Sequence, residues 1–107
     1  MKRYIRSSHD LDNLKLRANE LFTALKPYGA VRQTVDTDVY SITFNNGLND
    51  SDPLLVSHCI ESEGFTEIAC YGDVPEITDY IDNETGYVCA KLIVDEEGIR
   101  VEVSEEV

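Results

Sequence analysis

Residues 7–29 read SSHDLDNLKLRANELFTALKPYG, and their apolar positions have the period of an α-helix. Residues three or four positions apart share one face of a helix, and six apolar side chains keep this spacing: Leu11, Leu14, Ala18, Leu21, Phe22 and Leu25. Pro27 and Gly29 do not continue a helix readily and suit its exit turn. We therefore expect one long helix from about Asp10 to Lys26.

The start and the outer face of this helix can also be predicted. Ser7 and Asp10 have the spacing of an N-terminal capping box. The outward positions are mostly polar: Asp12, Asn13, Lys15, Arg17, Asn19, Glu20 and Thr23. Leu16 lies more than a third of a turn away from the apolar stripe, so it is either an ordinary exposed leucine or part of a contact site.

From Ala30 onward the apolar period changes to two, which is the period of a β-strand. The segments with this pattern are 31–35, 39–44, 54–61, 65–71, 88–94 and 99–103, and residues 2–6 alternate in the same way. Polar residues typical of turns separate these segments at 36–38, 45–53, 62–64 and 95–98. Residues 104–107 are expected to form a frayed acidic end.

A second, short helix is expected to begin at Asp73. The run Asp73-Val74-Pro75-Glu76 places a capping acid before a proline and a further acid in the first turn. Ile77, Tyr80 and Ile81 would form its buried face.

These elements predict the fold class. We expect an α+β domain of two layers, with one long N-terminal helix packed on a mostly antiparallel sheet of about five or six strands and one short inserted helix. The 107 residues contain no internal repeat and no long linker, so they are expected to form a single domain over residues 1–107. The sheet face away from the helix, together with the turns, is expected to carry most of the acids.

Charge is unevenly distributed along the chain. The formal net charge is −12. Residues 1–32 contain seven bases and three acids, a net charge of +4. From residue 33 onward the only bases are Lys91 and Arg100, against eighteen acids, a net charge of −16. Such an acidic field repels nucleic acid and anionic membranes and attracts basic partners.

No pattern in the sequence indicates catalysis or metal binding. Cys59, Cys70 and Cys89 include no C-x-x-C pair and are expected to be reduced, buried small residues. His58 and Cys59 are adjacent, and on a strand they would point to opposite faces. The polar loop at residues 45–52 fails the EF-hand pattern. We expect no metal, no cofactor and no enzymatic activity, and the absence of a long apolar segment favours a cytoplasmic location.

The acids then become the candidate binding surface. Outward residues on a strand lie ~6.8 Å apart and phosphates on a DNA strand ~3.4 Å apart, so acids on a sheet can match nucleic acid in pitch. The residues expected to bind a partner are acids with two tyrosines among them: Glu61, Glu63, Glu67, Tyr71, Asp73, Glu76, Asp79, Tyr80, Asp82, Glu84, Glu96 and Glu97. The expected partner is a basic protein surface, such as that of a nucleic-acid-handling enzyme, and not nucleic acid or a membrane.

In size, acidity and lack of catalytic motifs, the chain is similar to the small inhibitors by which phages and mobile elements block host nucleases, including anti-CRISPR and anti-restriction proteins. The similarity is one of composition and includes no alignable motif. It implies a DNA mimic that inhibits or regulates a nucleic-acid-handling protein.

Other readings of the same sequence stay open. The acids can serve solubility alone. The chain can be an antitoxin or assembly subunit that binds through Leu16 or an open strand edge. A small carboxylate-based hydrolase would need a pocket that holds a carboxylate of raised pKa. The sequence does not define an oligomeric state.

Overall fold

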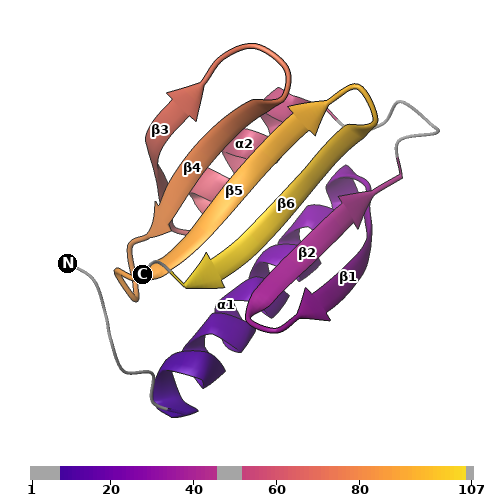
Figure 1. Ribbon diagram of the computed structural model, residues 1–107. Helices are drawn as coiled ribbons and strands as arrows, with labels where there is room; N and C mark the ends of the chain where they lie inside the picture. Colours follow the sequence, from indigo (N-terminus) through magenta and orange to yellow (C-terminus); the bar gives the residue numbers. More distant parts are fainter. Residues whose placement is uncertain (1–7, 46–51, 106–107) are drawn as a thin grey trace.

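Helix α1 (Ser8–Leu25) is the long N-terminal helix, and it lies across one face of the sheet (Figure 1). In this computed structural model, residues 8–45 and 52–105 are described. Of the six residues predicted for the buried face of α1, Leu14, Ala18, Leu21 and Leu25 are buried and Phe22 is partly buried, whereas Leu11 is exposed. The capping box at Ser7 and the alternating residues 2–6 lie outside the described residues.

The helix ends as the sequence predicts. A short 3₁₀ turn, η1 (Lys26–Tyr28), follows α1 and closes at Gly29. Gly29 has φ 103°, a left-handed conformation that glycine adopts without a steric penalty. Its N–H donates to the Lys26 carbonyl, and the chain then turns back into the sheet.

The sheet has six strands, all antiparallel, which confirms the predicted two-layer α+β fold. Their order across the sheet is β1-β2-β6-β5-β4-β3. The strands are β1 (Ala30–Asp36), β2 (Val39–Phe44), β3 (Phe65–Tyr71), β4 (Glu76–Asp82), β5 (Val88–Asp95) and β6 (Gly98–Glu105). Strands β1 and β3 are therefore the two edges, far apart in Figure 1.

The short helix is at a different place from the predicted one. Residues 54–61, expected to be a strand, belong to helix α2 (Pro53–Ser62). The side chain of Asp52 accepts from the Leu54 N–H, and Pro53 occupies the first turn, so the N-terminal signals of a helix were present. Val56, Cys59 and Ile60 are buried, which is the spacing of one helix face.

The helix expected at Asp73 is instead strand β4. Asp73 and Pro75 lie in the turn before the strand, and the capping reading of this turn was wrong. Within β4, Thr78, Tyr80 and Asp82 are buried, while the residues between them are partly exposed. This is the period of two, and the β-branched and aromatic residues of the segment favour a strand.

Strand β6 extends further than expected. Ser104 and Glu105 pair with β5 instead of fraying, and Glu105 is only 4% exposed. Residues 106–107 lie outside the described residues.

The core lies between the sheet and the two helices. Its sheet side includes Ile42 and Phe44 of β2, Val101 and Val103 of β6, and Val88, Ala90 and Leu92 of β5. Both helices of the described residues pack on the same side of the sheet, and we call the opposite side, which neither helix covers, the open sheet face (Figure 1).

Candidate functional site

Five of the twelve predicted binding residues gather at one end of the sheet. In an antiparallel sheet, the β3–β4 and β5–β6 turns lie at the same end, and Glu76 pairs with Val94 across β4 and β5. We call this region the acidic end and define it by Asp95 together with the five predicted residues: Tyr71, Asp73, Glu76, Glu96 and Glu97.

The two turns of the acidic end enclose an open hollow of about 430 Å³, lined by Val74, Asp95, Glu96, Glu97 and Arg100. The Asp95 carboxylate accepts from the Glu97 N–H at 2.8 Å, which fixes the β5–β6 turn. Arg100 Nη1 lies 3.2 Å from Asp95 Oδ2, so one base offsets part of the negative charge. Because both partners are partly exposed, this ion pair contributes little to stability.

Apolar side chains accompany the acids at this end. Tyr71 is 56% exposed and Val74 is 68% exposed. An exposed aromatic beside charges is typical of binding surfaces, where the ring supplies contact area and the charges supply orientation.

Three other predicted acids lie at the opposite end of the sheet. Glu61 and Glu63 are at the C-terminal end of α2, and Glu84 is in the turn between β4 and β5. The Asn83 N–H donates to the Gly64 carbonyl, which holds these two segments together. The predicted residues therefore do not form one patch.

The prediction that Tyr80 and Asp82 bind a partner at the surface is wrong. Each is 0% exposed, because alternate residues of β4 point toward the helices and not toward solvent. The hydroxyls of Tyr80 and Ser57 form a 2.6 Å hydrogen bond. Burial raises the pKa of Tyr80, although the hydrogen bond with Ser57 acts in the opposite direction.

Asp82 is buried because it binds Arg17, which was expected on the outer face of α1 and is only 6% exposed. Arg17 Nε and Nη2 donate to the two Asp82 oxygens, each at 3.0 Å. Nη2 also donates to the Glu63 carbonyl, and the guanidinium lies 5.0 Å from the centre of the Phe65 ring. One side chain thus joins α1, α2 and β4.

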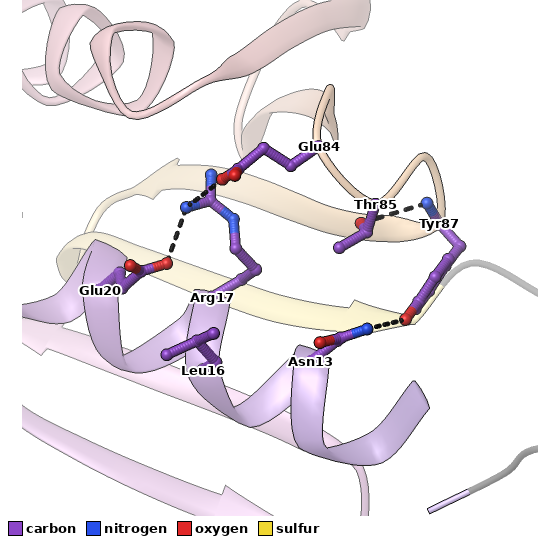
Figure 2. A pocket seen from close by; sticks show the side chains of 7 residues that line it. All are labelled: Asn13, Leu16, Arg17, Glu20, Glu84, Thr85 and Tyr87. Carbon is purple, nitrogen blue, oxygen red and sulfur yellow. Dashed lines mark hydrogen bonds and ion pairs between the residues drawn. The ribbon is translucent and has the colours of Figure 1, made fainter. Parts of the chain in front are cut away.

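The remaining guanidinium nitrogen of Arg17 binds two further acids. Nη1 lies 2.8 Å from Glu20 and 3.0 Å from Glu84, as Figure 2 shows. Four hydrogen bonds and the ion pair with Glu84 therefore engage all three guanidinium nitrogens of Arg17. Burial lowers the pKa of Arg17, but its acidic partners outweigh this effect and the net shift is upward.

The signal for this cluster was present in the sequence. Arg17 follows Leu14 by three residues and precedes Leu21 by four, so it belongs beside the apolar stripe of α1. Asp82 continues the alternation of Thr78 and Tyr80 on β4. The partner of Arg17 was not predictable, because the wrong assignment of β4 as a helix placed Asp82 at the surface.

A cleft of about 430 Å³ adjoins Arg17 between α1 and the β4–β5 turn (Figure 2). Asn13, Leu16, Arg17, Glu20, Glu84, Thr85 and Tyr87 line it. Asn13 donates to the Tyr87 hydroxyl at 2.9 Å across the cleft. Leu16 is 55% exposed, in agreement with its predicted position off the stripe. The donors of Arg17 are already used, so the cleft does not offer it to an anion.

The last two predicted residues, Glu67 and Asp79, lie along the strands. Asp79 pairs with Lys91, which pairs with Glu102, so unlike charges alternate across the open sheet face. The acids that alternation places on this face are Asp36, Asp79, Asp95 and Glu102, and the bases are Arg32, Lys91 and Arg100. The prediction was that this face and the turns together carry most of the acids, and the face itself carries these four.

The cysteines differ from one another. All three are free thiols. Cys59 is buried, as expected, and burial raises the pKa of its thiol, with Glu63 adding to the effect. Cys70 is exposed and Cys89 is half-buried, so the prediction of three buried cysteines is wrong for Cys70 and holds only in part for Cys89. His58 is exposed on α2 beside Cys59, and among the described residues no three His, Cys, Asp or Glu side chains are grouped to hold a metal ion.

Neither helix in the described part of the chain has the length and apolar character needed to cross a membrane. Comparison with known proteins found no matching family model, no matching curated protein and no matching solved structure.

Proposed function

We propose that this chain is a non-enzymatic binding module that docks its acidic end on a basic surface of a partner protein in the cytoplasm. The observation that carries the proposal is the meeting of the two acidic turns around Val74. These turns project Asp73, Glu96 and Glu97 beyond the sheet, and all three are exposed. At the opposite end, Arg17 binds Asp82, Glu20 and Glu84, so these three acids do not compete for this role.

Charge and apolar contact have separate roles in this proposal. The net charge of −12 speeds the encounter with a basic partner, since long-range attraction raises association rates. Tyr71 and Val74 then supply the desolvated contact that charge alone does not provide.

The partner that fits best is a protein that handles nucleic acid, because its binding groove already presents bases to a polyanion. Occupying that groove would inhibit the partner, in the manner of phage and mobile-element inhibitors of the anti-CRISPR or anti-restriction type. The carboxylate-hydrolase alternative gains no support from the cleft in Figure 2, whose two carboxylates both bind Arg17.

The proposal is tested by affinity capture from lysate of the native host at low and high salt. The bait is the wild-type chain or a variant that neutralises the acidic end: Asp73→Asn, Glu96→Gln and Glu97→Gln. A matched control neutralises three exposed acids elsewhere: Asp12→Asn, Glu61→Gln and Glu67→Gln.

We expect the wild type and the control to capture the same partner, and the acidic-end variant to lose it. Added salt and added DNA should both release the partner, because the contact is ionic and the DNA groove is shared. Capture that is the same for all three baits would contradict the role of the acidic end. Capture that resists DNA would contradict the mimicry.

A further inference from the structure

The two edges of the sheet are not equally protected. Edge strands expose unpaired backbone groups, and proteins commonly disrupt them with bulges. In β3 the register shifts between Glu67 and Ala69, in the middle of the strand. In β1 the shift lies between Ala30 and Arg32, at the start, and leaves residues 32–36 regular. Among the described residues, β1 is therefore the edge able to accept another strand.

The turn after β1 defines which backbone groups point outward. Asp36 pairs with Val39, so Thr37 and Asp38 form a two-residue turn. The residues that flank such a turn bond to each other, and the bonding positions then alternate along the strand. Arg32, Thr34 and Asp36 thus direct their backbone groups to β2, where they lie opposite Thr43, Ser41 and Val39. Gln33 and Val35 direct theirs outward.

The charged residues of β1 are complementary to those of a second, antiparallel β1 strand. Arg32 and Asp36 are exposed, and each lies two residues from Thr34 on the open sheet face. If two β1 strands pair antiparallel with Thr34 opposite Thr34, each Arg32 lies opposite an Asp36. In the same register Gln33 lies opposite Val35, and the outward backbone groups of both residues face each other.

The surroundings of β1 also suit a second copy. Val31 is 60% exposed and Val35 is 55% exposed, and pairing at this edge would cover both in part. The β3–β4 turn of the acidic end lies at the edge of the sheet opposite β1, and strand β2 lies between β1 and the β5–β6 turn.

We propose that two copies of this chain associate through their β1 strands, in the register that pairs Arg32 of each copy with Asp36 of the other. The association joins the two sheets into one continuous sheet. It is a surface separate from the acidic end, so the two proposals can fail independently. A contact of one strand pair is small, so the dimer is weak and depends on concentration.

Two charge reversals test the register. Sedimentation of the full chain at ~0.15 M salt measures the dissociation constant of the dimer. Arg32→Asp or Asp36→Arg alone places like charges opposite each other in both pairs, and each should weaken the dimer at least about tenfold. An equal mixture of the two variants restores both unlike pairs, so it should dimerise although neither variant does so alone.

The matched control is Glu61→Arg, which makes the same charge change as Asp36→Arg but lies on α2, the helix that packs beside β3 at the opposite edge of the sheet. We expect this variant to dimerise like the wild type. A wild-type chain that stays monomeric up to about 1 mM overturns the proposal. So does a mixture that remains monomeric, or a single reversal that leaves the dimer unchanged. A mixture that dimerises also shows that both variants are folded.

Discussion

At the residue scale, Arg17 organises the contact between the helices and the sheet. A buried guanidinium is tolerated only when its donors are satisfied, and Asp82, Glu20, Glu84 and the Glu63 carbonyl satisfy them. The pairing joins α1 to β4, because the guanidinium of Arg17 donates to both oxygens of Asp82. It also withdraws Asp82 from the charge available to a partner.

We predict that Arg17→Met lowers the free energy of unfolding by about 3–5 kcal/mol, because Asp82 is left buried without its charge partner. Lys15→Met, an exposed change on the same helix, should change it by less than about 0.5 kcal/mol. Urea denaturation measures both. Adding Asp82→Asn to Arg17→Met should cost less than the sum of the two single changes, and simple additivity would count against a direct coupling.

Tyr80 gives the protein an alkaline sensitivity. Because burial raises its pKa, the folded state holds the phenolic proton to higher pH than the unfolded state does. The stability from this group is complete below the unfolded pKa of about 10 and is lost as pH rises through the folded pKa. Cys59 acts in the same direction, since its pKa is also raised.

We predict that Tyr80→Phe removes part of the loss of stability above about pH 10. At neutral pH the same variant should be less stable than the wild type by about 1 kcal/mol, because Ser57 loses its hydrogen-bond partner. Thermal denaturation at pH 7 and at several higher values measures both effects. Parallel pH profiles for the two proteins would show that Tyr80 does not contribute.

At the element scale, the regular amphipathic patterns were predictable and the ambiguous ones were not. The long stripe of α1 and the alternation in β1, β2, β3, β5 and β6 matched the structure. The segment of helix α2 was predicted as a strand and that of strand β4 as a helix, because a short apolar run fits either structure. In both cases a proline and an acid preceded the run, and only one of the two pairs formed a cap.

We predict that Asp52→Ala destabilises the protein by about 0.5–2 kcal/mol, because the Leu54 N–H at the start of α2 loses its side-chain acceptor. Glu61→Ala, an exposed change in the last turn of α2, is the comparison and should have little effect. The helix signal in circular dichroism should weaken at a lower urea concentration for the Asp52 variant only. Equal midpoints would show that the cap is not needed.

At the scale of the whole molecule, charge is arranged in three ways. Acids are concentrated at the acidic end, and around Arg17 they are neutralised by its guanidinium. On the open sheet face, acids and bases alternate from strand to strand. Linear sequence revealed the excess of acid but not this division, because the partners of an acid come from strands and helices far away in the chain. Tyr71, Asp73, Glu76, Glu96 and Glu97 met because the antiparallel connections bring their two turns together.

The bulge at Ile68 has a consequence for how large an assembly can grow. A chain with two regular edges could add copies at both sides without limit and form a filament. Here one side is interrupted, so growth through β1 stops once that edge is occupied. The extra residue in β3 would then act as a terminator that keeps the assembly closed and finite.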